Sequence, residues 1–453
     1  MNEDPKETYY LEKAPIWRAM INLCIPMVLA ISVTTIYNLI SIFFLGTLHN
    51  TAMITAVSLG VPIMALGMAF GGVFGVGGST YISRLLGEKN HDDVKHVAAF
   101  TLYGSLIVGV IIAALAIIYI DPLVHLLGAD ATSFTFTKNF VLVTLISLPI
   151  LMANFAVEQI VRSTGAAKQS LYGTILSVVA NLVFDVLFIL ILHWNVVGAA
   201  LAIGIASLIS LLYYAWYLQK KGGQVKLSAK YFKITKKISS QVFSIGASEL
   251  IMSSFMIVTA LLFNNFAVQY GDNVLAAAGI AQRIVQVPEF MCMGIVLGIM
   301  PLLGFAYGAK LTARLRSAMV YSGVVIAAFV SIFSTTVYLF RDQILGFFTQ
   351  DPNVLTIGVV ILVAQLVSTI FNGFTGLFMT YFQATNKPVR TTIMAVAQGG
   401  LYIPIIIVAH AYRGLYGVIW AIVITEFITF ALSVALFFGR RDRSESASVI
   451  ASN

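Results

Sequence analysis

The chain carries little charge for its length. Of its 453 residues, only 10% are Asp, Glu, Lys or Arg, whereas soluble domains carry about 25%. Hydrophobic residues make up 59%, above a soluble norm of about 45–50% that already counts glycine. Because no water-soluble core could hide so much apolar surface, the composition predicts a polytopic membrane protein. This prediction replaces the one from length alone, which would suggest about three soluble domains at roughly 150 residues each.

Cysteine is also scarce. The only two, Cys24 and Cys292, lie inside apolar segments, which excludes a disulfide framework and a zinc site. The sequence contains no G-x-x-x-x-G-K-[ST] phosphate loop, since GGVFGVGGS at 71–79 has no lysine. The formal net charge of +8 comes from residues in short loops between apolar runs, so it does not indicate nucleic-acid binding. We therefore expect no metal, no cofactor, no nucleic-acid partner and no ATP-driven chemistry.

Long apolar runs fill the rest of the sequence. A membrane span needs about 20 mostly apolar residues, and on that rule the chain is all-α with twelve transmembrane helices. The predicted spans are 16–46, 51–83, 94–120, 138–161, 169–192, 197–219, 240–269, 273–307, 315–340, 354–383, 389–411 and 414–438.

The basic residues predict how the spans are oriented. Of the 27 Lys and Arg residues, 23 fall in the termini and loops of one side, and seven of these are lysines in the central loop 220–237. By the positive-inside rule, both termini and this loop are cytoplasmic. We expect a multi-pass protein of the cell membrane.

Short motifs recur along the chain at a nearly constant offset. The pairs are Gly87-Glu88-Lys89 with Gly308-Ala309-Lys310, Ser163-Thr164-Gly165 with Ala384-Thr385-Asn386, and 197–202 with 416–421. Because six spans separate the copies, they are predicted to be parallel repeats with a substrate path between them. The alternative is that glycine-rich loops recur in any polytopic protein.

The repeat divides the chain into three predicted parts. These are an N-terminal lobe at 1–219, a basic cytoplasmic linker at 220–239, and a C-terminal lobe at 240–453 with a short basic tail.

Charged residues within the spans are candidates for function, because each costs about 2.5–3.5 kcal/mol on insertion scales. Asp185 is the strongest, since it lies in the middle of NLVFDVLFIL with Asn181 one helical turn earlier. Burial favours the proton-bound form of such a carboxyl, and its oxygens could also coordinate Na⁺. The structural alternative is a hydrogen bond between helices. Asn154, in the preceding span, could face this pair.

The other charged residues are open to two interpretations. Glu158 and Arg162 have the i, i+4 spacing of an ion pair but could also line a cavity. Arg283 and Glu289 could line the path or clamp a helix around Pro288. Glu426 is predicted to be an internal hydrogen-bonding partner.

The ordered set of motifs resembles the multidrug and toxic compound extrusion (MATE) family over essentially the whole chain. The motifs are YNLISIFFLG at 37–46, ISRLLGEKN, EQIVRSTGAAKQS at 158–170, NLVFD, VVGAALA, QRIVQVPEF and PLLGFAYGAK, and the polar start ETYYLEKAPIWRAM is similar to that of exporters from Gram-positive bacteria.

This resemblance implies two pseudo-symmetric six-helix lobes in a V shape around a central cavity. It also implies export of organic cations in exchange for H⁺ or Na⁺, with Asn181 and Asp185 in the cation-coupling role. The chain departs from the family where many relatives have an aspartate in the first span, because that position is Ser41. A branch of the family uses acidic residues where this chain has Met256 and Asn372, so we expect no C-terminal coupling site.

On this basis, Asp185, Asn181 and Asn154 are expected to couple the cation, and the substrate is expected to be a small organic cation or drug. We expect a monomer surrounded by membrane lipid. Two rivals remain: a flippase for a lipid-linked precursor, which needs basic cavity residues for phosphate, and a passive channel, which needs a filter or a ring of like residues. The residues expected to line the substrate cavity are Tyr37, Ser41, Glu158, Met256, Arg283, Glu289, Met293 and Asn372.

Overall fold

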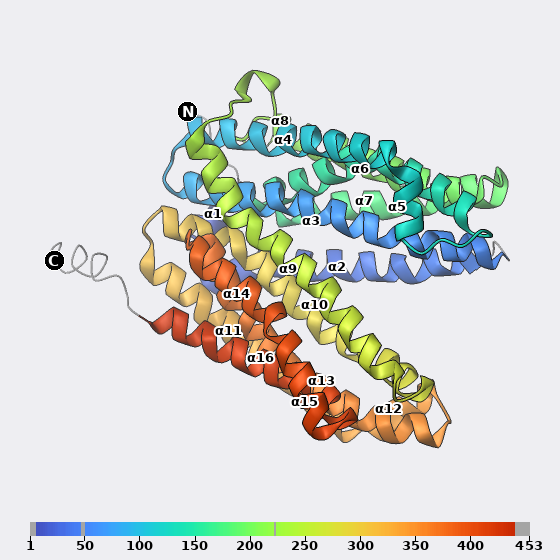
Figure 1. Cartoon of the computed structure of the whole chain (residues 1–453). Coiled ribbons are helices and arrows are strands. Elements are labelled where there is room, and N and C mark those ends of the chain that lie inside the picture. Colours follow the sequence, from blue (N-terminus) through green and yellow to red (C-terminus); the bar gives the residue numbers. More distant parts are fainter. Residues whose placement is uncertain (1–5, 47–49, 222, 440–453) are drawn as a thin grey trace. The chain divides into compact units, whose positions relative to one another are not determined.

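The computed structural model describes residues 6–46, 50–221 and 223–439, and all regular structure within them is helical (Figure 1). Twelve helical segments there are long and apolar enough to cross a bilayer, which confirms the predicted number. They are α2 (Ile16–Gly46), α3 (Thr51–Gly87), α4 (His91–Ile118), α6 (Phe134–Ser163), α7 (Ala167–Asp185) with η1 (Val186–Ile191), α8 (Asn195–Lys220), α9 (Lys236–Val268), α10 (Asp272–Gly308), α11 (Thr312–Leu339), α13 (Pro352–Ala384), α14 (Pro388–Gly400) with α15 (Tyr402–Arg413), and α16 (Leu415–Phe438).

Four short helices were not predicted, because none is long enough to give a membrane signal. They are α1 (Lys6–Glu12), α5 (Ile120–Leu126), the single 3₁₀ turn η2 (Ala229–Tyr231) and α12 (Arg341–Phe348).

The eleventh span is broken, although the sequence predicted one uninterrupted run. Helix α14 ends at Gly400 and α15 begins at Tyr402. Pro404 has no N–H, so the carbonyl of Gly400 loses its helical hydrogen-bond partner. The two consecutive glycines, Gly399 and Gly400, further weaken the helix at this point.

The chain forms two compact units. The first contains the described residues up to Ser253, together with Leu297–Ala318 and Ala384–Asn386. The second contains Ser254–Val296, Met319–Gln383 and the described residues from Lys387 onward. Helices α9, α10 and α11 are therefore each divided between the two units. The predicted lobe boundaries around the linker 220–239 stay a prediction.

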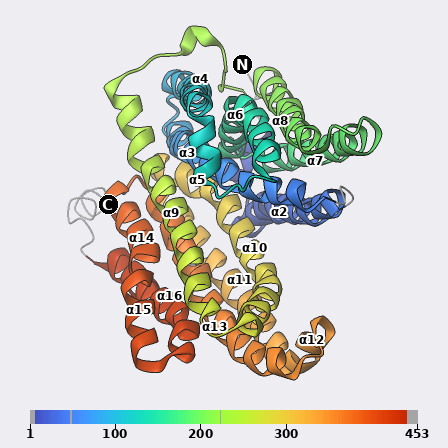
Figure 2. The same ribbon diagram turned by 45° about the vertical axis from the view of Figure 1, so that its right-hand side comes forward.

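In the first unit, α6 packs against α3, α4 and α8, while α7 packs against α2 and α8 (Figure 2). The glycines that recur every four residues along α3 form its contact with α6. A methyl group added at Gly71 would lie 3.3 Å from the Cα of Met152, and one at Gly75 would lie 3.3 Å from the Cα of Ala156. This small-xxx-small pattern of glycines therefore brings the two backbones together.

In the second unit, α16 packs against both α14 and α15. Apolar side chains of α10, α13 and α16 form one core cluster, in which Ala281, Leu362 and Ile419 are buried. Aromatic rings add to this core, because Phe371 of α13 contacts both Phe427 and Phe430 of α16. These contacts hold α10, α13 and α16 together around the polar residues described below.

The backbone confirms the internal repeat. Lys89 and Lys310, which are equivalent positions of the recurring loop motif, both have φ of 58°. Gly165 and Asn386 are equivalent at the same offset and have φ of 83° and 54°. Positive φ is uncommon for residues other than glycine, so its recurrence at equivalent positions indicates that the two copies fold alike. Helices α5 and α12 also begin at equivalent positions, Ile120 and Arg341.

Candidate functional site

Asp185 lies deep in the first unit at a change of helix type. It is the last residue of α7, and the chain continues as the π-helix η1. Its side chain is only 3% exposed, and Asn181, one turn earlier on the same face, is 6% exposed. Single π-helical turns inside α-helices occur frequently at functional sites. Asp185 thus combines an intramembrane charge with a local irregularity of the backbone.

Helix α2 contributes a hydrogen-bond partner to this carboxylate. The Tyr37 hydroxyl is hydrogen-bonded to Asp185, and Ser41, one turn further along α2, is hydrogen-bonded to Tyr37. The contact is possible because α2 packs along α7. Two residues expected to line a cavity, Tyr37 and Ser41, are therefore brought to the predicted coupling residue. That they also contact substrate stays a prediction.

Three oxygens of the predicted coupling residues have unsatisfied hydrogen-bonding capacity. Within the described part of the chain, Oδ2 of Asp185, Oδ1 of Asn181 and Oδ1 of Asn154 are buried and have no hydrogen-bond partner. Buried polar atoms are normally paired. Carboxylate and amide oxygens accept hydrogen bonds and coordinate hard cations, so these residues have the chemistry to hold a proton or Na⁺.

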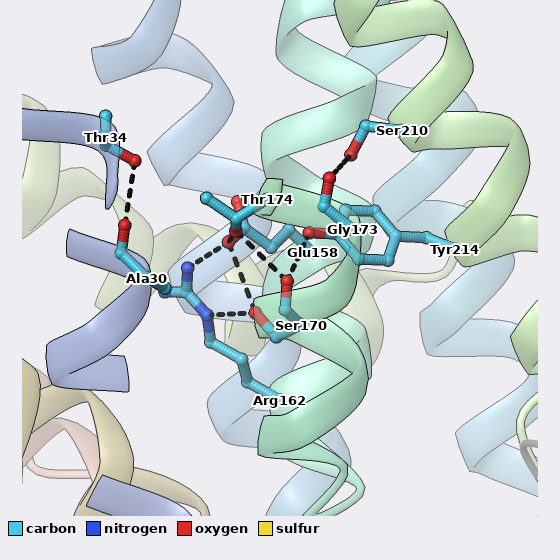
Figure 3. Close-up of polar contacts among 9 residues, drawn as sticks. All are labelled: Ala30, Thr34, Glu158, Arg162, Ser170, Gly173, Thr174, Ser210 and Tyr214. Carbon is cyan, nitrogen blue, oxygen red and sulfur yellow. Dashed lines mark hydrogen bonds and ion pairs between the residues drawn. The ribbon is translucent and has the colours of Figure 1, made fainter. Parts of the chain in front are cut away.

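Glu158 is part of a separate polar network between α6 and α7 (Figure 3). It forms an ion pair with Arg162, one turn later, as the i, i+4 spacing suggested. The Arg162 Nε donates to Ser170 Oγ at 3.0 Å, and Ser170 Oγ donates to Glu158 Oε1 at 3.2 Å. Thr174 Oγ1 also donates to Glu158 Oε1, at 3.3 Å. These bonds tie the beginning of α7 to the end of α6.

Helix α8 secures the same segment of α7. The Tyr214 hydroxyl donates to the Ser170 carbonyl at 2.9 Å, and Ser210 Oγ donates to the Gly173 carbonyl at 3.1 Å. Gly173 is required here, because an added methyl group would overlap the Tyr214 ring. The first half of α7 is thus held on two sides, while Asp185 lies at its other end. That Glu158 contacts substrate stays a prediction.

The second unit contains a polar cluster of its own. Asn372 Nδ2 of α13 donates to Glu426 Oε1 of α16 at 3.2 Å, and Gln398 of α14 is also hydrogen-bonded to Glu426. The prediction that Glu426 is an internal hydrogen-bonding partner is confirmed. Gln398 was not among the residues predicted for a site, although a glutamine next to Gly399 within an apolar span was a signal. Glu289 of α10 is half-buried.

The remaining residues predicted for the cavity have accessible side chains. Met256 is 68% exposed, Met293 is 52% exposed, and Arg283 is also exposed. Exposed apolar side chains of a membrane-spanning helix can face lipid as readily as a ligand. A contact between these three residues and substrate stays a prediction.

Known proteins resemble this chain along most of its length. The sequence model of the MatE family matches residues 26–187 and again residues 245–408. The start and the end of the two matched segments are separated by nearly the same offset as the recurring loop motifs. The family model thus covers each copy of the internal repeat once.

Several relatives are named as multidrug export proteins. The chain is 34% identical over 438 residues to the multidrug export protein MepA of Staphylococcus saprophyticus, covering 97% of both chains. It is 33% identical over 441 residues to the protein of that name from Staphylococcus aureus, again covering 97% of both. A crystal structure of MATE in the bent conformation superimposes with a TM-score of 0.88 at 23% identity and covers 100% of both chains.

Proposed function

Because the chain belongs to the MatE family, we propose that it is a secondary-active exporter that expels amphipathic organic cations in exchange for H⁺ entering through Asp185. Family membership and the names of the staphylococcal relatives support multidrug efflux by a membrane transporter. The coupling ion and the residues that bind it are the proposal. Na⁺ is the alternative ion.

The observation that carries the proposal is that the Asp185 carboxylate is buried with only one of its two oxygens hydrogen-bonded within the described chain. An isolated carboxylate in an apolar interior is strongly disfavoured and is normally neutralised. Tyr37 supplies one hydrogen bond, but the second carboxylate oxygen is buried without a partner within the described chain. Uptake of a proton at this oxygen removes the charge, and its release restores it. Alternating exposure to the two sides of the membrane would turn these steps into proton transport.

The surrounding contacts can convert protonation into movement. Tyr37 is on α2 and Asp185 is on α7, so a change in the charge of Asp185 alters the bond between the two helices. The beginning of α7 is held against α6 by the network around Glu158. We propose that α2 moves when Asp185 is protonated, because α6 and α8 hold the beginning of α7 in place. The change of charge at Asp185 would then shift the equilibrium between two positions of α2.

The substrate class follows from the charges within the spans. Buried carboxylates attract cations, and aromatic faces also bind them. A phosphate-bearing lipid precursor would instead need basic side chains free to bind it. Arg162 is engaged by Glu158, which leaves Arg283 as a single cation well inside the predicted spans, against several carboxylates. Organic monocations are therefore the proposed substrates.

The basic loops support a bacterial cell-membrane topology with both termini in the cytoplasm. We propose that one copy of the chain is the transporting unit, since each half of the repeat supplies one six-helix lobe.

The test is dye efflux from proteoliposomes with wild-type protein and Asp185→Asn. An ethidium-type dye should move against its gradient when a pH difference is imposed, and the variant should fall to the level of empty liposomes. Asp121→Asn is the matched control, because Asp121 pairs with Lys138 at an exposed site and should transport normally. A thermal unfolding curve like that of wild type would show that Asp185→Asn is folded.

The other outcomes are informative. Normal pH-driven efflux by Asp185→Asn would refute the coupling role of Asp185. Efflux driven only by a Na⁺ gradient would keep the exporter and replace the ion. If no gradient drives any cationic dye, the substrate belongs to another class, and a lipid-linked precursor becomes the next candidate.

A further inference from the structure

Exchange through Asp185 makes no use of a buried arginine near the end of α3. The side chain of Arg84 is only 4% exposed. One of its terminal nitrogens donates to Gln241 Oε1 of α9 at 3.1 Å, and its guanidinium carbon lies 5.3 Å from the centre of the Tyr81 ring. Its Nε is buried and has no hydrogen-bond partner among the described residues. The two groups that contact the guanidinium are both uncharged.

No carboxylate of the described chain forms an ion pair with Arg84. Glu88 follows one turn later, but its side chain is exposed. Asp93 is paired with Lys237 instead, at 2.9 Å. Because arginine is almost never fully buried without an opposite charge, the loss of hydration at Arg84 opposes the packing that covers this side chain.

The helices that cover Arg84 come from the second copy of the repeat. A methyl group added at Gly308 of α10 would overlap the Arg84 carbonyl, and one added at Gly77 of α3 would overlap the Val242 carbonyl of α9. Val242 directly follows Gln241, the hydrogen-bond partner of Arg84. All of these residues lie within the first unit. Glycine therefore allows α9 and α10 to approach α3 closely enough to desolvate the charge.

Separation of these helices would relieve the cost of this burial. An exposed guanidinium is hydrated, and Glu88 has the i, i+4 spacing to pair with it. Arg84 therefore favours the separated arrangement, whereas the close packing at the glycines favours the closed one. Opposing contributions of this kind keep two arrangements close in free energy, as a transport cycle requires.

We propose that the buried charge of Arg84 destabilises the closed contact of α3 with α9 and α10, and thereby allows these helices to separate when substrate is loaded from the cytoplasm. The proposal rests on the export function proposed above, because an exporter has to open this end of the molecule to receive its substrate. The neutral side chain of Gln241 is essential to it. A glutamate at that position would pair with Arg84 and hold the contact closed.

The experiment follows maleimide labelling of Cys24 in a Cys292→Ala background. Cys24 of α2 is buried against Gly298 of α10, so its thiol becomes reactive when the two copies separate. Gln241→Glu adds a charged hydrogen-bond acceptor beside Arg84 and should slow labelling about tenfold. Gln241→Leu removes the hydrogen bond and leaves the charge buried, so it should accelerate labelling.

A second variant tests the charge itself. Arg84→Met keeps most of the length of the side chain, and it should slow labelling and raise the unfolding temperature even though a hydrogen bond is lost. Export of an ethidium-type dye should also slow in Arg84→Met and in Gln241→Glu. The matched controls are Arg316→Met, at an exposed position of α11, and Gln269→Glu, at an exposed position directly after α9. Both should behave as wild type.

The results separate this proposal from the one on which it rests. Faster labelling or a lower unfolding temperature in Arg84→Met would show that Arg84 holds the helices together, and would refute the proposal while retaining the exporter. Equal labelling rates for Gln241→Glu and Gln241→Leu would also refute it. Labelling needs neither dye nor gradient, so the expected labelling rates without any dye export by wild-type protein would overturn the proposed function and keep the effect of Arg84 on the contact.

Discussion

A charged side chain inside the membrane needs a partner or a proton, and this chain shows three solutions. Glu158 has a basic partner, Arg162, on its own helix. Asp185 has a single hydroxyl, from Tyr37, and Glu426 has two amides. Because Glu158 is matched by an opposite charge, we assign it to stability, whereas Asp185 is the carboxylate proposed to bind the coupling ion. The same chemical group thus serves two purposes, and its neighbours determine which one.

The stability role of Glu158 can be tested by removing one partner of the ion pair. Glu158→Gln leaves Arg162 charged, mostly buried and unpaired, which should destabilise the protein by about 3–5 kcal/mol. The double variant Glu158→Gln with Arg162→Gln should recover most of this loss, because no uncompensated charge remains. The measurement is thermal unfolding in detergent.

A matched comparison is Lys138→Gln, which breaks the exposed pair with Asp121 and should cost only about 0–1 kcal/mol. If Glu158→Gln unfolds at the wild-type temperature and instead impairs dye export, Glu158 belongs to the substrate path and the assignment to stability is wrong.

At the scale of whole helices, a short element that the sequence did not reveal is firmly attached. Arg314, near the start of α11, donates from Nε to the Leu11 carbonyl at 2.7 Å, from one terminal nitrogen to Ala14 at 2.7 Å, and from the other to Tyr10 at 2.8 Å. One guanidinium therefore satisfies the carbonyls at the C-terminal end of α1 and in the turn that follows. Hydrogen bonds from charged donors to helix ends are among the stronger ones.

Arg314→Lys should release α1. A lysine ammonium cannot reach three carbonyls in this fork geometry, and loss of one or two charge-assisted hydrogen bonds should cost about 2–4 kcal/mol. The readouts are the unfolding temperature and the rate of proteolysis near the N-terminus, both compared with Arg316→Lys at an exposed position of the same helix. Equal proteolysis rates for the two variants would show that Arg314 does not secure α1.

At the scale of the whole molecule, the internal repeat reappears as a reciprocal contact. A methyl group added at Gly87 of α3 would overlap the Phe305 carbonyl of α10, and one at Gly308 of α10 would overlap the Arg84 carbonyl of α3. Gly87 and Gly308 are equivalent positions of the repeat, and so are Arg84 and Phe305. The two helices therefore meet through equivalent residues, as a local two-fold relation requires, and only glycine allows this approach.

The contact between the two copies of the repeat, which we call the seam, includes α2 as well as α3 and α10. A methyl group added at Gly298 of α10 would lie 2.6 Å from the Cα of Cys24. The start of α2 and the end of α10 are proposed to face the cytoplasm. An exporter that loads substrate from that side has to separate these two helices during its cycle. The buried Cys24 thiol is a natural reporter of this opening.

Gly298→Ala should favour the opened seam. The added methyl group cannot be accommodated without a backbone shift, and overpacking of this kind costs about 1–3 kcal/mol, so maleimide labelling of Cys24 should accelerate about tenfold in a Cys292→Ala background. Gly279→Ala on the same helix, where an added methyl group meets no atom within 4 Å, should leave the rate unchanged. Labelling at the same rate in both variants would show that this seam does not open at Gly298.

The sequence by itself determined most features that depend on a contiguous segment, apart from the short helices and the break in the eleventh span. The lengths of the apolar runs predicted the twelve spans, the i, i+4 spacing predicted the Glu158–Arg162 pair, and the recurring loop motifs predicted the repeat. Asp185 and Asn181 could be placed on one helix face because helical geometry relates residues four apart, whatever surrounds them.

Only the tertiary structure decided which helices share a site. Tyr37 reaches Asp185 from a helix far earlier in the chain, and Arg314 reaches the end of α1 across most of the sequence. The hydrogen bonds of Glu426 join three helices, since Asn372 lies on α13 and Gln398 lies beside the break between α14 and α15. Such contacts depend on the rotation and register of each helix against its neighbours, and these are set by side-chain packing over the whole bundle. No local pattern in the sequence records that packing.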